Sequence, residues 1–152
     1  MINLGPYSGS NCPNVHFRPV LLDRVLEAAA LILFLVLCGS IYWFYTHRGG
    51  TLPHEVWMVW GIAALCSIVL GGCAYLPVRF VRFPVRVTDR NVAVQYLLAV
   101  RLVRVVNVIL NLTFLSQVYM EYYRWAEPFL GATFVLLIVA LIGYYVLAFR
   151  YK

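Results

Sequence analysis

Charged residues are scarce in this chain of 152 residues. Asp, Glu, Lys and Arg make up only 12% of it, about half of their usual share in a soluble domain, whereas 63% of the residues are hydrophobic. The pieces between the apolar stretches have roughly one or two dozen residues each, too few to bury a hydrophobic core. The composition therefore excludes a soluble catalytic domain and predicts a protein that works in or at a membrane.

Sequence motifs for catalysis or cofactor binding are absent as well. The chain contains no HExxH, no GxSxG, no phosphate-cradling glycine loop and no DNA-binding motif. We therefore expect a non-enzymatic protein without a cofactor and without a nucleic-acid partner. Its formal net charge of +6 at pH 7 is better explained by contact with anionic lipid headgroups.

Long apolar segments are what the chain has instead. A helix of about 20 apolar residues crosses roughly 30 Å of hydrocarbon, and four segments reach or approach this length. We expect helices at about residues 25–45, 56–76, 89–120 and 128–149, within one transmembrane domain that covers residues 1–152. The predicted fold class is all-α, an integral membrane four-helix bundle.

Basic residues are divided unequally between the two sides of this predicted bundle. One side has the following: Arg18, Arg24, Arg79, Arg82, Arg86, Arg90, Arg150 and Lys152. The loops on the opposite side have Arg48 and Arg124. The positive-inside rule makes the richer side cytoplasmic. We therefore expect both termini in the cytoplasm, which agrees with an even number of crossings.

The third predicted helix is longer and more polar than the others. Thr88 and Asp89 suit its start, because such side chains cap free backbone N–H groups and favour the helix dipole. From residue 89 to residue 120 the helix would measure about 48 Å, which exceeds the bilayer core. We therefore expect a cytoplasmic or interfacial extension of this helix.

A polar stripe follows one face of the third helix. It consists of Arg101, Arg104, Asn107 and Asn111, spaced three or four residues apart. Lipid cannot satisfy these groups, so they either join neighbouring helices or form a ligand or ion site. Glu27 lies at the same expected depth, which predicts an ion pair between Glu27 and Arg104. The second helix offers small residues that permit close approach: Ala64, Ser67, Gly71 and Ala74.

Arginines alternate with apolar residues between the second and third helices. They are Arg79, Arg82, Arg86 and Arg90. Pro77 and Pro84 interrupt any helix here, so an extended segment along the cytoplasmic headgroups is expected. Its guanidinium groups would bind the phosphates of anionic membrane lipids. The alternative is a plain connector that satisfies the positive-inside rule.

Two histidines, His47 and His54, are weak candidates for a metal site. A Gly-Gly turn separates them, and a catalytic zinc normally has three protein ligands at suitable distances. A hydrated polar loop is the simpler interpretation, and we expect no metal here.

The region that leads into the third helix contains a recognisable pattern. It reads Phe83-Pro84-Val85-Arg86-Val87-Thr88-Asp89-Arg90-Asn91, followed by Gln95, Tyr96, Ala99, Arg101 and Arg104. The pattern resembles the bacterial membrane domain of unknown function in SdpI-type toxin-immunity and signalling proteins. Family members have a Pro-x-His type motif in the outer loop, whereas Pro53 and His54 are adjacent here. The resemblance implies a role in immunity or signalling at the bacterial cytoplasmic (inner) membrane.

Three functions stay open at this point. The first, which the resemblance favours, is a protein that binds a peptide or another membrane partner. The second is a subunit of an oligomeric transporter or channel with a polar path along the third helix, which would require a homo-oligomer. The third is an intramembrane enzyme that uses His47, His54 and Glu55 or Glu121, and no motif supports it.

Overall fold

The computed structural model describes residues 20–77, 80–81, 83–84 and 91–151. Within these ranges the chain is helical and has no strand. The helices are α1 (Leu21–His47), α2 (His54–Cys73), α3 (Val92–Met120), the short 3-10 helix η2 (Arg124–Ala126) and α4 (Glu127–Arg150). Four of them are long and apolar enough to cross a membrane, which confirms the all-α class and the multi-pass architecture predicted from the sequence.

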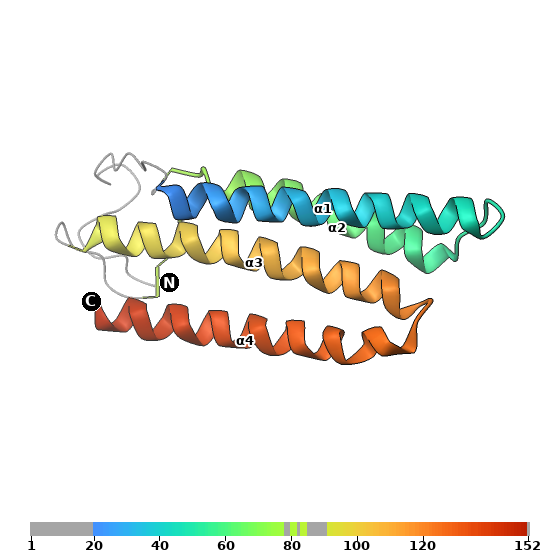
Figure 1. Cartoon of the computed structure of the whole chain (residues 1–152). Helices are drawn as coiled ribbons and strands as arrows, with labels where there is room; N and C mark the ends of the chain where they lie inside the picture. Colours follow the sequence, from blue (N-terminus) through green and yellow to red (C-terminus); the bar gives the residue numbers. More distant parts are fainter. Residues whose placement is uncertain (1–19, 78–79, 82, 85–90, 152) are drawn as a thin grey trace.

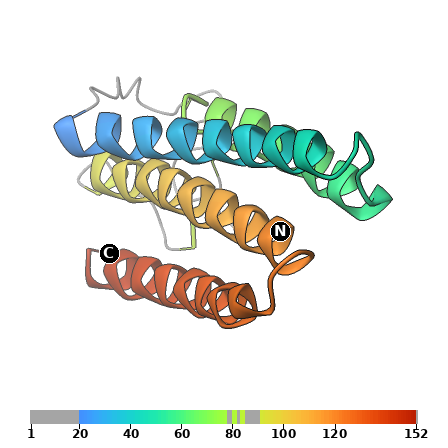
Figure 2. The same cartoon turned by 45° about the vertical axis from the view of Figure 1, so that its right-hand side comes forward.

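The central helix of the bundle is α3. Figure 1 shows α1 and α2 along one side of α3 and α4 along the opposite side, and the rotated view in Figure 2 agrees. The helix α3 packs against each of the other three, while α1 and α2 contact each other more sparsely. We call the end where α1 begins and α4 ends the terminal end, and the opposite end, with the α1–α2 and α3–α4 connections, the hairpin end (Figure 1).

Local sequence explains where most of the helices begin and end. Gly49 and Gly50 have φ angles of 75° and 76°, a left-handed conformation that turns the chain between α1 and α2. Pro53 precedes the first residue of α2, and a proline occupies the first turn of α4. The expected capping residues of α3, Thr88 and Asp89, lie outside the described residues, and α3 is described from Val92 onward.

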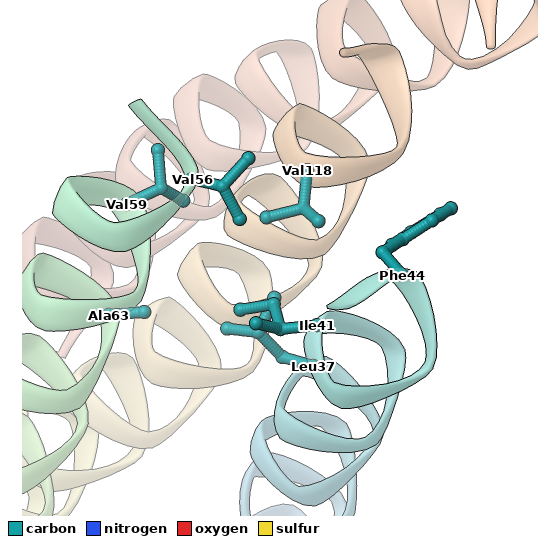
Figure 3. Close-up of a cluster of buried hydrophobic side chains, with 7 residues drawn as sticks. All are labelled: Leu37, Ile41, Phe44, Val56, Val59, Ala63 and Val118. Carbon is teal, nitrogen blue, oxygen red and sulfur yellow. The ribbon is translucent and has the colours of Figure 1, made fainter. Parts of the chain in front are cut away.

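An apolar cluster joins α1, α2 and α3 in the half of the bundle next to the hairpin end. Its buried members are Leu37, Ile41, Phe44, Val56, Val59, Ala63 and Val118. Figure 3 shows Leu37, Ile41, Val56 and Val118 facing one another between the three helices, while the ring of Phe44 lies at the edge of the group. Phe44 is 1% exposed and stacks on Tyr122, with ring centroids 4.0 Å apart. We call this set the hairpin cluster. It packs the three helices together, and a hydrogen bond of 3.2 Å between the hydroxyls of Ser40 and Tyr119 also joins α1 to α3 in this half.

The outer surfaces of the helices remain apolar. Large side chains such as Leu35 of α1, Ile68 of α2 and Phe134 of α4 are more than half exposed. A soluble protein would bury such residues, whereas a membrane protein presents them to lipid chains. This surface agrees with the assignment of the chain as a multi-pass membrane protein.

Candidate functional site

Two acids of α1 meet two arginines of α3 in the half of the bundle next to the terminal end. Arg104 lies 3.1 Å from Asp23 (Nη1 to Oδ1) and 2.6 Å from Glu27 (Nη2 to Oε1). Arg101 lies 3.4 Å from Asp23 (Nε to Oδ1). The pair that the sequence suggested, Glu27 with Arg104, is therefore in contact. We call these four residues the charge cluster.

Burial divides the charge cluster into an inner and an outer part. The side chains of Asp23 and Arg104 are 0% and 2% exposed, whereas those of Glu27 and Arg101 are 33% and 32% exposed. A buried charge needs a partner at close range, because its lost hydration costs several kcal/mol. Asp23 and Arg104 are such partners for each other. Arg101 adds a second positive charge next to Asp23, and Glu27 adds a second negative charge next to Arg104.

Sequence reasoning missed Asp23. Its Oδ1 atom accepts the contacts from the arginines, while its Oδ2 atom accepts a hydrogen bond of 3.0 Å from the backbone N–H of Val20. Asp23 therefore caps the start of α1 and also fastens it to α3. The available signal was its spacing from Glu27, since residues four apart share one helix face.

The amide part of the polar stripe faces α2. Asn111 is 1% exposed; its Nδ2 atom donates to Oδ1 of Asn107 at 3.1 Å, and its Oδ1 atom accepts a hydrogen bond from Ser67 at 3.1 Å. Three of the four predicted stripe residues thus contact neighbouring helices, the two arginines on α1 and Asn111 on α2, while Asn107 is hydrogen-bonded to Asn111 within α3. Ser67, one of the small residues noted in α2, is the direct partner of the stripe.

A cavity of about 460 Å³ opens between α1 and α2, with α3 behind it. Its apolar walls include Ala30 and Phe34 of α1 and Ile68 and Gly71 of α2. Five polar residues also line it: Glu27, Ser67, Tyr75, Arg104 and Asn107. The cavity therefore joins the charge cluster to the amide part of the stripe, an arrangement that sequence analysis did not foresee.

Tyr75 follows α2 at the edge of this cavity. Its hydroxyl donates a hydrogen bond of 2.7 Å to Oε1 of Glu27, and its ring lies 5.8 Å from the guanidinium carbon of Arg104. The hydrogen bond to Glu27, together with burial of the hydroxyl, raises the pKa of Tyr75 above its ordinary value. The hydroxyl therefore stays protonated at neutral pH and fixes the orientation of the Glu27 carboxylate.

Gln95 of α3 ties α4 to the bundle at the terminal end. It is fully buried, and its Nε2 atom donates to the carbonyl oxygens of Ala148 at 2.9 Å and Tyr151 at 3.1 Å. The last carbonyls of a helix have no partner within that helix. Gln95 is the partner of one such carbonyl, that of Ala148, and of the carbonyl of Tyr151, which follows the helix. The contact is therefore structural, and Gln95 does not line the cavity.

The other predicted site residues lie elsewhere. Arg79, Arg82, Arg86 and Arg90 fall outside the described residues, so their proposed contact with lipid headgroups stays a prediction. His47 and His54 are exposed on the two sides of the α1–α2 loop. The ring of His47 stacks on Trp43, and its Nδ1 atom lies 3.0 Å from the Trp43 carbonyl oxygen. Among the described residues no three His, Cys, Asp or Glu side chains are grouped as metal ligands.

In chemical terms the site combines an apolar lining with a group of polar and charged side chains whose charges balance. The charges of two carboxylates and two guanidinium groups cancel, and the amide and hydroxyl groups supply hydrogen-bond donors and acceptors.

Comparison with protein-family models, with curated proteins and with solved structures finds no match to this chain.

Proposed function

We propose that this chain is a non-enzymatic membrane protein that binds a peptide or another membrane partner through the cavity between α1 and α2. The observation that carries the proposal is the cavity itself, of about 460 Å³. Binding sites are typically concave and apolar, with a few convergent polar groups and volumes of about 300–1,000 Å³. This cavity has that composition, and its polar groups converge from three helices.

The location of the cavity within the bundle supports a role in binding. The hairpin cluster packs α1, α2 and α3 together in one half, whereas α1 and α2 separate around the cavity in the other half. Exposed apolar residues of both helices, such as Leu31 and Ile68, lie beside the cavity. A partner within the bilayer would therefore reach the cavity sideways, between the two helices.

The proposed orientation puts the terminal end in the cytoplasm of a bacterium, at the inner membrane. The support is the excess of arginine and lysine on that side in the sequence. The 29 residues of α3 extend for about 44 Å, more than the roughly 30 Å of a bilayer core. This length supports an extension of α3 beyond the hydrocarbon on the cytoplasmic side. Labelling of a cysteine placed at the C-terminus by a reagent that stays outside the cell would overturn this orientation.

A role in immunity or signalling of the SdpI type is the most specific form of the proposal. Its support is the sequence pattern from Phe83 to Asn91 and onward to Arg104. Within that pattern, Arg101 and Arg104 belong to the charge cluster and Gln95 anchors α4. The residues that carry the resemblance thus include those that assemble the bundle.

A pair of glycine substitutions tests the binding function. Gly71 lines the cavity, Gly72 does not, and an added Cβ atom meets no neighbour within 4 Å at either position. Gly71→Leu should fill the cavity, whereas Gly72→Leu should place its side chain on the exposed surface. Each variant would be cross-linked in intact cells and purified in mild detergent.

The expected result is a stoichiometric partner with the wild type and with Gly72→Leu, but not with Gly71→Leu. Equal recovery of the partner with both variants would overturn the role of the cavity. A ring of identical chains without a partner would instead favour the oligomeric transporter or channel.

A further inference from the structure

The charge cluster limits which ligands the cavity accepts. Asp23 and Glu27 carry two negative charges, Arg101 and Arg104 carry two positive charges, and every one of them is within ion-pair distance of an opposite charge. A charged ligand group would find no spare countercharge among the described residues of the cluster, and burying an unpaired charge is costly. The electrostatics of the cavity therefore favour an uncharged ligand.

The cavity nevertheless has hydrogen-bonding capacity left over. Oδ1 of Asn107 accepts a hydrogen bond from Asn111, but Nδ2 of Asn107 donates to no described residue. Both hydrogen bonds received by Glu27, from Tyr75 and from Arg104, go to Oε1, and Oε2 receives none from the described residues. Nδ2 of Asn107 and Oε2 of Glu27 are thus a donor and an acceptor that the described residues leave for a ligand.

The free donor and acceptor lie near each other along the bundle. Asn107 follows Arg104, the partner of Glu27, by three residues, which corresponds to about 4.5 Å along the axis of α3. A hydroxyl or an amide can donate and accept within such a span. The rest of the lining is apolar, with Leu26, Ala30 and Phe34 on α1 and Ile68 and Leu70 on α2.

We infer that the cavity binds an uncharged lipid-like molecule, an apolar chain that ends in a hydroxyl or amide head. The head of the ligand would accept a hydrogen bond from Nδ2 of Asn107 and donate one to Oε2 of Glu27. The apolar chain of the ligand would lie between α1 and α2. The inference rests on the proposed function, because it requires the cavity to be a binding site. It narrows the partner to a lipid-like molecule of the bilayer and makes a peptide an alternative outcome of the test.

Photolabelling of the purified full-length protein in phosphatidylcholine nanodiscs tests this ligand class. The probe is a dodecanol with a diazirine in its chain, and the labelled peptides are located by mass spectrometry. Labelling of the cavity walls, for example near Ala30 and Ile68, is measured relative to labelling of the exposed face of α4. Competitors with the same chain are dodecanol, dodecylamine, dodecyl sulfate and dodecane, which differ only in the head.

Dodecanol should compete for the cavity about thirtyfold better than dodecane, because each of its two hydrogen bonds should contribute about fivefold. Dodecylamine and dodecyl sulfate, both charged at pH 7, should compete no better than dodecane. The substitution Gly71→Leu should abolish labelling of the cavity, and its matched control Gly72→Leu should retain it. Asn107→Leu should reduce the advantage of dodecanol over dodecane, since the hydrogen bond to Oε2 of Glu27 remains, while labelling itself persists.

The outcomes separate this inference from the proposed function. If a charged competitor matches or exceeds dodecanol, the uncharged-head assignment is wrong, although the cavity still binds ligands. A hydrophobic peptide serves as a fifth competitor. If it alone displaces the probe, the lipid-like class is wrong and peptide binding gains support. If Gly71→Leu is labelled in the cavity region as strongly as Gly72→Leu, the cavity is not a binding site and the proposed function fails as well.

Discussion

The two halves of the bundle join α1 to α3 by different chemistry, mainly apolar packing in one half and ion pairs in the other. Near the hairpin end, α1, α2 and α3 meet through the hairpin cluster, in which Leu37, Phe44 and Val118 are almost fully buried. Near the terminal end, α1 and α3 meet through the charge cluster and leave a cavity beside it. Apolar packing can lose one member and keep the rest, whereas removing one charge leaves its buried partners unpaired.

The largest effect should come from Arg104→Leu. This substitution would leave Asp23, which is fully buried, with the longer contact to Arg101 as its ion pair among the described residues, and would remove the ion pair between Glu27 and Arg104. Breaking a buried ion pair from one side costs about 3–5 kcal/mol, enough to lower both unfolding free energy and abundance in the membrane. The measurement is unfolding by SDS in mixed micelles, together with quantitative immunoblotting of membranes.

Arg124→Leu is the matched control for this loss, because Arg124 is an exposed arginine of η2. It should change the free energy of unfolding by no more than about 0.5 kcal/mol. Equal stability of the two variants would mean that the charge cluster does not hold the terminal half together.

Reversing the charges of Glu27 and Arg104 should lower accumulation of the protein almost as much as Arg104→Leu does. The double variant should recover only part of the accumulation that the single variant loses. Glu27→Lys should strongly impair accumulation, and adding Arg104→Glu should restore only part of it. The reason is Asp23, which lies 3.1 Å from Arg104 and would then face another carboxylate. Adding Asp23→Asn to the double variant should improve the rescue. Full rescue by the double variant alone would show that Asp23 contributes little to the cluster.

A moderate effect is expected from Phe44→Ala in the hairpin cluster. The ring of Phe44 stacks on Tyr122 and is almost completely buried, so its removal leaves a cavity. We expect a loss of about 2 kcal/mol in unfolding free energy, because the lost packing is not offset by lipid contact. Leu35→Ala, at a side chain 59% exposed on α1, should cost almost nothing in the same SDS assay. A larger loss from Leu35→Ala would contradict the assignment of its face to lipid.

Two asparagines of α3 should separate structural from ligand-binding roles. Asn111→Leu removes hydrogen bonds to Asn107 and Ser67 and should cost about 1 kcal/mol of stability. Asn107→Leu should cost less, since the Nδ2 group of Asn107 has no described partner. The substitution Asn107→Leu should instead lower the binding of the partner or ligand more than it lowers stability. A normal binding level for Asn107→Leu, with normal accumulation, would place Asn107 among the purely structural residues.

The smallest effect is expected from Tyr75→Phe, which removes the hydrogen bond to Glu27. Because Tyr75 is 64% exposed, the loss should not exceed about 0.5 kcal/mol. The folded-state pKa of Tyr75 is raised, so its contribution is present below its unfolded pKa of about 10 and disappears as the pH rises through the folded value. Stability measured between neutral and strongly alkaline pH should therefore fall slightly more for the wild type than for Tyr75→Phe.

Much of the charge cluster could be predicted because the position of a residue within an apolar run indicates its expected depth in the membrane. Glu27 and Arg104 each lie near one end of an apolar run, so their pairing followed from the cost of isolated charges in lipid. Asp23 was missed because the first helix was expected to begin near residue 25, whereas α1 begins at Leu21. With the earlier start, Asp23 belongs to the same helix face as Glu27 and turns toward α3.

The sequence by itself determined the number of crossings, their approximate bounds and the face of α3 that is polar. These properties depend on composition and helical period, which are local. Only the tertiary structure decided that α3 is the centre of the bundle, that Gln95 anchors α4, and that α1 and α2 separate around a cavity. Such features depend on how side chains from distant segments fill the space between helices, and no local pattern in the chain encodes that volume.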